Sequence, residues 1–204
     1  MILSVHPTDP APRHINMIVD LLKNGGVIIF PTDTVYGLGC SIEQPKAVDR
    51  IARIKGIKKE KANFSAIFNT LSMISEYTRP IDNHVYRMVR RNLPGPFTFI
   101  LNANNNIPRI FQSKKKTIGI RIPENPIVMA IVEALGQPLL TTSIRDQDTI
   151  VEYTTDPQII DDNFGKMVDL VIDGGLGGNE PSTVIDCTSD AIEITRQGKG
   201  LLLE

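Results

Sequence analysis

The chain has few of the residues that build disulfide frameworks, metal centres or aromatic stacking platforms. Its 204 residues include two cysteines, three histidines and no tryptophan, and aromatic residues make up 5%. Two cysteines, Cys40 and Cys187, are too few for a disulfide framework and fit a reducing, cytoplasmic compartment. The histidines are dispersed without metal-ligand spacing, so no protein metal site is expected. The scarcity of aromatic side chains argues against a surface that stacks single-stranded bases.

The chain also lacks a long hydrophobic run and a strong net charge. No apolar stretch is long enough to cross a bilayer, and the first residues lack the charged region and cleavage site of a signal peptide. The formal net charge of -1 gives no global attraction to nucleic acid. With 41% hydrophobic residues the chain can build a core, and its length fits one domain over residues 1–204. We expect a cytoplasmic protein without a membrane partner.

Basic residues are nevertheless unevenly distributed. They crowd three segments, at 50–61, 87–91 and 114–116. Each segment alone is best explained as a solvated helix face or loop. If the three converged in space, they would form a surface that attracts the phosphates of structured RNA.

The stretch Phe30–Cys40, with the sequence FPTDTVYGLGC, brings hydroxyls, a carboxylate and a phenol to the end of a predicted strand. The apolar run before it predicts a buried strand, which must end at Pro31 because proline cannot donate to a central strand. In open α/β sheets, small ligands bind at that edge. The alternative is a loop in which Asp33 or Thr34 caps a following helix. The stretch alone does not decide between the two.

The remaining pattern predicts helices and strands that mix without strict alternation. Helices are expected over 15–22, 45–57, 71–77, 82–91 (capped by Asp82), 126–135 and 156–164. Strands are expected over 27–30, 65–68, 97–101, 117–122, 139–142, 170–172, 182–186 and 192–196. This order favours a single α/β domain with a twisted, mixed parallel and antiparallel sheet and flanking helices.

Six short motifs occur in an order that resembles the YrdC/YciO family. They are PTDTVYGLG at 31–39, PGPFT at 94–98, IGIRIP at 118–123, TTS at 141–143, PSTVID at 181–186 and RQG at 196–198. The resemblance extends over nearly the whole chain, from about Ile15 to Gly198. It implies the YrdC-like fold.

The best-understood members of this family are L-threonylcarbamoyladenylate synthases. The resemblance therefore implies a nucleotidyltransferase-type reaction that joins L-threonine, bicarbonate and ATP into threonylcarbamoyl-AMP and pyrophosphate. That intermediate serves the threonylcarbamoyladenosine modification of tRNA. ATP is a substrate, and Mg²⁺ is expected to arrive with its phosphates and to keep several of its own waters.

Motif matching assigns nine site residues and no catalytic residue. The nucleotide-binding set implied by the resemblance is Lys55, Thr117, Ser143 and Arg196. The threonine-binding set is Thr34, Tyr36, Arg121, Thr141 and Ser182.

Several of these residues have a simpler alternative. Arg121 is the strongest candidate, because a lone arginine on an apolar strand needs an anionic partner if it is buried. It would need none on the exposed side of an edge strand. Lys55 could instead complement a helix C-terminus, Arg196 could be a surface strand residue, and Tyr36 could belong to the core.

Three positions depart from the synthase pattern and make the chain most similar to the YciO branch. The family's Lys-x-Arg becomes Lys55-Gly56-Ile57, a histidine associated with threonine binding becomes Phe68, and Ser-x-Asn becomes Ser143-Ile144-Arg145. These changes predict a weak or altered activity. Two alternatives stay open. One is a protein that binds double-stranded or structured RNA without synthase activity. The other is a related hydrolase or nucleotide-carbamoyl activity that keeps nucleotide binding but has a changed second substrate, in a pocket made more apolar by Ile57 and Phe68.

Overall fold

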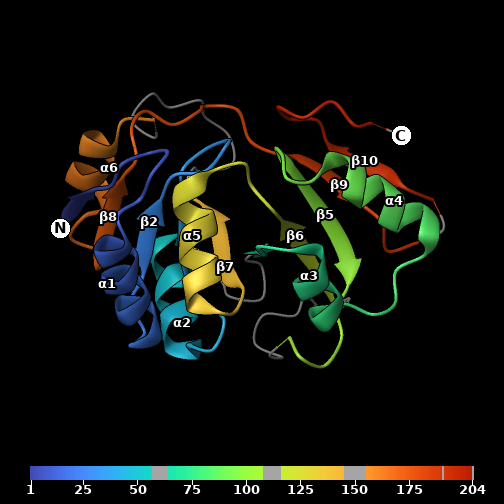
Figure 1. The fold of residues 1–204 in the computed structure, drawn as a ribbon, viewed down its shortest axis with the longest axis horizontal. Coiled ribbons are helices and arrows are strands. Elements are labelled where there is room, and N and C mark those ends of the chain that lie inside the picture. Colours follow the sequence, from blue (N-terminus) through green and yellow to red (C-terminus); the bar gives the residue numbers. More distant parts are fainter. Residues whose placement is uncertain (57–63, 108–115, 145–154, 190, 204) are drawn as a thin grey trace.

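The structure, a computed structural model, describes residues 1–56, 64–107, 116–144, 155–189 and 191–203. In this part of the chain a ten-stranded sheet runs across the molecule, with the two termini at opposite ends of the view (Figure 1). The strand order is β1-β8-β2-β3-β7-β4-β6-β5-β9-β10. Four neighbouring pairs are parallel and five are antiparallel, which confirms the predicted mixed sheet.

The strands are β1 (Ile2–Ser4), β2 (Ile28–Phe30), β3 (Gly37–Ser41), β4 (Ser65–Ile67), β5 (Phe97–Asn102), β6 (Thr117–Arg121), β7 (Leu139–Ser143), β8 (Leu170–Asp173), β9 (Thr183–Asp186) and β10 (Glu193–Arg196). The helices are α1 (Pro12–Lys23), α2 (Pro45–Ile54), α3 (Leu71–Tyr77), α4 (Asn83–Asn92), α5 (Pro126–Leu135) and α6 (Pro157–Phe164). Among the described residues, none of these helices has the length and apolar character needed to cross a bilayer.

Alternation along β2 separates two hydrophobic cores. Ile28 and Phe30 belong to one core and Ile29 to the other, because successive strand residues point to opposite faces. Helices α1 and α5, which lie side by side in Figure 1, cover the face of Ile28 and Phe30. Residues of α2, α4 and α6 belong to the core of Ile29.

Helix α5 follows its local sequence signals. Pro126 occupies the first turn, where its missing N–H costs nothing. The side chain of Asn125 accepts hydrogen bonds from the N–H groups of Ile127 and Val128 at 3.1 and 3.2 Å. Gly136 ends the helix with a φ of 72°, a conformation that glycine adopts without strain. The predicted helix over 126–135 is confirmed.

The main differences from prediction lie in β1 and β3, neither of which was expected. Pro31 ends β2 as predicted, but the chain then returns as β3, antiparallel to β2 and β7. No helix follows the loop, so the alternative in which Asp33 or Thr34 caps one is wrong. Asp82 does stand at the N-cap of α4, yet its side chain accepts no capping hydrogen bond there.

Candidate functional site

One face of the central strands carries small and polar side chains. On β6, Ile118 and Ile120 point into a hydrophobic core, so their neighbours in the strand face the other way. On that other side Gly119 pairs with Ser65 of β4, and Ser65 pairs with Thr141 of β7. This polar face therefore brings together four of the predicted site residues, namely Thr117, Arg121, Thr141 and Ser143.

Arg121 forms a buried ion pair across this face. Its Nη2 donates hydrogen bonds to Oδ1 of Asp33 and to Oγ1 of Thr34, both at 2.9 Å. The exposed fractions of the Arg121 and Asp33 side chains are 10% and 9%. The prediction that a buried Arg121 needs an anionic partner is confirmed, and the protein itself supplies one. The edge-strand alternative is wrong, because β6 lies between β4 and β5.

The charge of Arg121 is only partly compensated. Burial lowers the pKa of its guanidinium, the carboxylate of Asp33 opposes that effect, and the nearby charge of Arg196 adds to it. In addition, its Nε is buried and has no hydrogen-bond acceptor among the described residues. A buried donor of this kind is costly to leave unpaired. One buried donor of the guanidinium is therefore left unsatisfied by the described residues.

The loop before β3 forms hydrogen bonds with three other segments of the chain. Oδ2 of Asp33 accepts a hydrogen bond from the backbone N–H of Glu124 at 3.2 Å, and its carbonyl oxygen accepts one from Nζ of Lys199 at 2.7 Å. The carbonyl oxygen of Thr34 accepts one from the N–H of Gly178 at 2.8 Å. These contacts fix both residues that hold Arg121. The motif pattern gave no role to Asp33 or Lys199, and only the contacts identify them.

Ser182 and Arg196 are in contact with each other, and the charge of Arg196 acts on Arg121. Oγ of Ser182 lies 2.7 Å from Oγ1 of Thr98. Nε and Nη2 of Arg196 donate to the carbonyl oxygen of Ser182 at 3.1 and 2.8 Å, and Nη2 also donates to its Oγ at 3.2 Å. Arg196, predicted for the nucleotide, thus lies next to a residue predicted for threonine.

Lys55 forms a hydrogen bond with Ser143, one of the residues of the polar face. Lys55 is the C-cap residue of α2, as its simpler alternative expected. Its Nζ donates a hydrogen bond of 2.9 Å to the carbonyl oxygen of Ser143 in β7. Two of the four residues predicted for the nucleotide are therefore in contact. Thr117, also in that set, begins β6 and is half-buried.

Tyr36 is a core residue in this structure. It is fully buried, its hydroxyl donates to the carbonyl oxygen of Gly175 at 2.7 Å, and it accepts from the N–H of Gly174 at 3.3 Å. Burial raises the pKa of its phenol to about 12. These contacts favour the core alternative over direct contact with a ligand. Thr141, another predicted threonine contact, is also buried, with Oγ1 3.5 Å from the carbonyl oxygen of Leu38.

The side chain of Phe68 faces away from that of Arg121, although its backbone N–H donates to the carbonyl oxygen of Arg121 at 2.9 Å. It is fully buried in the core of Ile120, and its ring packs edge-on against Tyr77 with the centroids 5.8 Å apart. The side chain of Phe68 therefore lies on the opposite side of the sheet from the polar face that carries Arg121. The other two departures, Ile57 and Arg145, lie outside the described residues.

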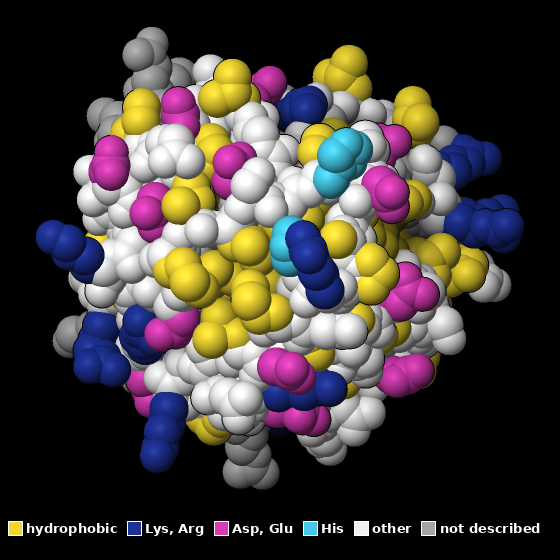
Figure 2. Space-filling model, turned by 60° about the vertical axis from the view of Figure 1, so that its left-hand side comes forward, with side chains coloured by type: hydrophobic (Ala, Val, Ile, Leu, Met, Phe, Trp, Pro, Cys, Tyr) yellow, Lys and Arg dark blue, Asp and Glu magenta, His cyan; other side chains and the backbone are white. Residues whose placement is uncertain are grey.

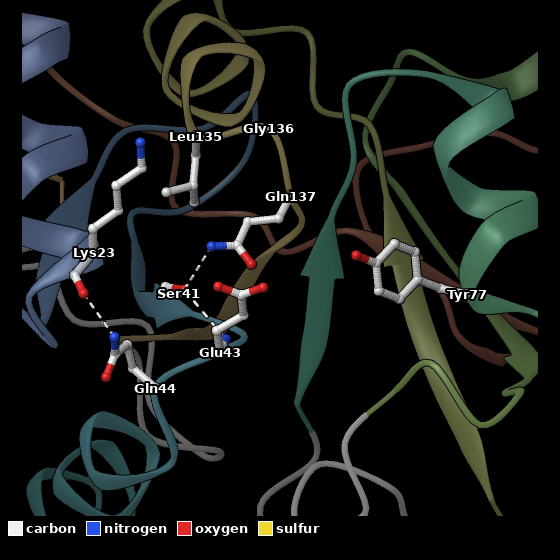
Figure 3. Close-up of a pocket in the computed structure, with 8 residues that line it drawn as sticks. All are labelled: Lys23, Ser41, Glu43, Gln44, Tyr77, Leu135, Gly136 and Gln137. Atoms are coloured by element: carbon white, nitrogen blue, oxygen red, sulfur yellow. Dashed lines mark hydrogen bonds between the residues drawn. The ribbon is translucent and has the colours of Figure 1, made fainter.

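A pocket of about 340 Å³ lies at the C-terminal ends of α1 and α5 (Figure 3). Oγ of Ser41 forms hydrogen bonds there with the side chain of Gln137 and the backbone N–H of Glu43. The residues that line the pocket are Lys23, Ser41, Glu43, Gln44, Tyr77, Leu135, Gly136 and Gln137. None of the nine predicted site residues is among them, so this pocket is not the predicted site.

The described basic residues of the first two segments do not meet. Described residues of the first lie on α2 and those of the second on α4, and these helices are well separated in Figure 1. Arg50 of α2 is engaged with Asp169, its Nη1 lying 2.5 Å from Oδ2. Of the third segment, only Lys116 is described. In the described ranges, the first two segments therefore do not form one phosphate-attracting surface. A space-filling view turned by 60° shows basic and acidic side chains scattered around an apolar patch near the centre of that face (Figure 2).

Among the described residues, no group of three or more histidine, cysteine, aspartate or glutamate side chains is placed to hold a metal ion.

Comparison with known proteins places this arrangement in a family. The chain is 44% identical to the uncharacterized protein YciO of Escherichia coli K12, over 96% of this chain and 94% of that protein. The crystal structure of E. coli YciO matches with a TM-score of 0.91, at 42% identity, over 98% of this chain and 96% of the other.

Relatives with an assigned activity are more distant. A threonylcarbamoyl-AMP synthase of Coxiella burnetii strain RSA 493 is 31% identical, over 87% of this chain and 94% of that protein. The structure of P. abyssi Sua5 complexed with L-threonine matches with a TM-score of 0.88 at 25% identity, over 97% of this chain and 57% of the Sua5 chain. The family model of Sua5, YciO and YrdC proteins, described as telomere recombination, matches residues 20–198. The chain therefore belongs to the Sua5/YciO/YrdC family.

Proposed function

We propose that this protein is a threonylcarbamoyl-AMP synthase-like enzyme. It would convert L-threonine, bicarbonate and ATP into threonylcarbamoyl-AMP and pyrophosphate, in the service of tRNA threonylcarbamoyladenosine modification. Similarity to the C. burnetii synthase and to Sua5 complexed with L-threonine supports the reaction class. The greater similarity to YciO is the reason that the activity must be tested directly.

One observation carries the proposal. Arg121 is buried and bonded to Asp33 and Thr34, yet its Nε finds no acceptor among the described residues. A buried guanidinium with an unused donor is suited to the carboxylate of an amino acid, because a charge-assisted hydrogen bond then satisfies both groups. Ser182 and Thr98 add hydroxyls nearby, which suit the polar remainder of threonine.

The nucleotide end of the proposed site is the contact between Lys55 and Ser143, with Thr117 on the same polar face. An ammonium group stabilises the negative charge of phosphates, and the hydroxyls supply further hydrogen bonds. Mg²⁺ would neutralise charge on the triphosphate. Because it keeps several waters of its own, a dedicated set of protein ligands is not required.

The test measures pyrophosphate release from ATP by the purified protein with bicarbonate, with and without L-threonine. Threonine-dependent release with detectable threonylcarbamoyl-AMP is the expected result. Arg121→Ala should reduce it to background, whereas Arg87→Ala, on the exposed face of α4, should leave it unchanged. Equal release with and without threonine by the folded protein, or full activity of Arg121→Ala, would contradict the proposal.

The second candidate is a structured-RNA-binding protein without synthase activity. It is supported by the three exposed arginines of α4, namely Arg87, Arg90 and Arg91, which give one helix a basic surface. It ranks second because the described basic residues of α2 do not extend that surface. The hydrolase alternative has lost the support of Phe68, which packs in the core.

A further inference from the structure

The segment that follows β10 forms hydrogen bonds on both sides of Ser182. The backbone N–H of Lys199 donates to the carbonyl oxygen of Pro181 at 2.9 Å, and the N–H of Gly198 donates to Oγ1 of Thr183 at 3.0 Å. Gly198 lies so close to this strand that a Cβ there would overlap the carbonyl oxygen of Pro181. The residues before and after Ser182 are therefore both fixed by this segment.

The same segment is attached to α4 further along the chain. The side chain of Asn92, which is 4% exposed, accepts a hydrogen bond from the N–H of Leu203 at 2.9 Å and donates one to its carbonyl oxygen at 2.8 Å. Between these points, the carbonyl oxygen of Gly200 accepts a hydrogen bond from Oγ1 of Thr183 at 2.7 Å. The backbone that carries Lys199 is thus held on both sides, so its side chain starts from a defined position.

Lys199 reaches from this segment to the loop before β3. Its Nζ donates a hydrogen bond of 2.7 Å to the carbonyl oxygen of Asp33, 166 positions earlier in the chain. Asp33 and the next residue, Thr34, are the two residues that bind Nη2 of Arg121. One lysine therefore connects the loop that carries Thr34 to the strand end that carries Ser182.

We infer that Lys199 is a positioning residue, which fixes the loop of Asp33 and Thr34 relative to Ser182. The motifs assign Thr34 and Ser182 to the same ligand, although the two residues come from distant segments. Groups that bind one ligand from different segments must be held within about 0.5 Å of the productive geometry. Lys199 therefore affects the affinity for the ligand without touching it. This effect rests on the proposed function, whereas the order of the loop can be measured without it.

Because Lys199 is exposed, two other roles must be separated from positioning. Water could replace its bond to the loop at no cost, or its charge could attract an anionic ligand directly. Neither of these roles changes the order of the loop. The N–H groups of Thr34 and Gly178 report that order, since they donate to Oγ1 of Thr32 and to the carbonyl oxygen of Thr34 at 3.1 and 2.8 Å. Such groups exchange their hydrogens with solvent when the loop opens.

The experiment compares the unchanged protein with Lys199→Met, Lys199→Arg and the control Lys166→Met, which alters an exposed lysine after α6. Hydrogen exchange followed by mass spectrometry measures the opening of the loop, and titration calorimetry measures the Kd of L-threonine. In Lys199→Met, peptides that contain Thr34 or Gly178 should exchange about three- to tenfold faster, the contribution of one hydrogen bond. The Kd of L-threonine should rise by a similar factor. Lys199→Arg keeps a charged donor and should restore both quantities, and Lys166→Met should change neither.

Three results would overturn the inference. The first is unchanged exchange of the loop in Lys199→Met, and weaker threonine binding on its own would then mean that the charge of Lys199 acts on the ligand. The second is faster exchange over the whole protein, which would make Lys199 a residue of general stability. The third is a faster-exchanging loop with an unchanged Kd of L-threonine.

Failure of the proposed function gives a different result. If the unchanged protein binds no L-threonine, the synthase proposal is contradicted. Faster exchange confined to the loop in Lys199→Met would still support Lys199 as the residue that holds it, and unchanged exchange would overturn that role. Threonine-dependent pyrophosphate release together with unchanged loop exchange in Lys199→Met would support the synthase proposal and overturn the inference.

Discussion

Arg121 and Asp33 lie 88 positions apart in the chain, and their side chains meet at 2.9 Å in a nearly buried ion pair. The pair joins the loop that follows β2 to the end of β6. Because both groups have left water, each depends on the other for its solvation. The same two residues form the centre of the proposed ligand site, so stability and binding are linked at this point.

Removal of one partner should therefore destabilise the fold. Asp33→Ala leaves the charge of Arg121 buried and without its carboxylate, which typically costs about 3–5 kcal/mol in the free energy of unfolding. Urea unfolding followed by circular dichroism measures the loss. The double variant Asp33→Ala/Arg121→Met, in which neither charge remains, should recover part of it. A loss below about 1 kcal/mol for Asp33→Ala would mean that the pair behaves like an exposed one.

Tyr36 should make the free energy of unfolding decrease at alkaline pH. Its phenol has a pKa raised to about 12 by burial, against an ordinary value of about 10 in the unfolded chain. The folded state thus binds the proton more tightly than the unfolded state. This contribution is complete below pH 10 and is lost as the pH rises through that window to about 12.

Tyr36→Phe tests the effect. The variant loses the hydrogen bonds to Gly174 and Gly175 and should be less stable at pH 7 by about 1 kcal/mol. The difference from the unchanged protein should shrink between pH 10 and pH 11, because in this range Tyr36 ionises in the unfolded chain while it stays protonated in the folded protein. Urea unfolding at each pH measures it, with the exposed Tyr86→Phe as the matched control. A difference that stays constant with pH would contradict the assignment.

Gly119 should not tolerate a side chain. A Cβ at this position would lie 2.7 Å from Oγ of Ser65 and 3.1 Å from Cγ2 of Thr98. Gly119→Ala should therefore lower the free energy of unfolding by about 1–3 kcal/mol through overpacking. Adding Ser65→Ala removes the nearest atom and should restore part of the stability. If the double variant is no more stable than Gly119→Ala alone, the clash is not the cause.

The RNA alternative makes a prediction of its own. Binding through phosphates must weaken steeply with salt, because each neutralised phosphate releases counterions. The triple variant of the α4 arginines, Arg87→Ala/Arg90→Ala/Arg91→Ala, should then bind duplex RNA more weakly and with a shallower salt dependence. Fluorescence anisotropy between low and physiological salt measures both quantities. An unchanged salt slope in the variant, or no binding of the unchanged protein at low salt, would exclude the α4 arginines as an RNA-binding surface.

Local sequence signals were enough to predict most of the helices and many of the strands. The helix over 126–135 is marked by Asn125, by Pro126 in its first turn and by Gly136 after its last, and α5 has these bounds. β3 was missed because two glycines in Gly37–Ser41 give it a low strand propensity. It is a strand because β2 and β7 pair with it on both sides. Such pairing depends on residues far away in the chain and leaves no local pattern.

The sequence by itself determined that the chain belongs to an α/β family with a mixed sheet, and that Arg121 would need an anion if buried. It could not identify that anion, because Asp33 reaches Arg121 only after the strands have paired and a loop has folded over them. Nor could it decide that Phe68 faces away from Arg121, since a shift of one residue in strand register reverses every side chain. Composition, spacing and motif order act along the chain, whereas register, burial and the meeting of distant charges are decided only by tertiary packing.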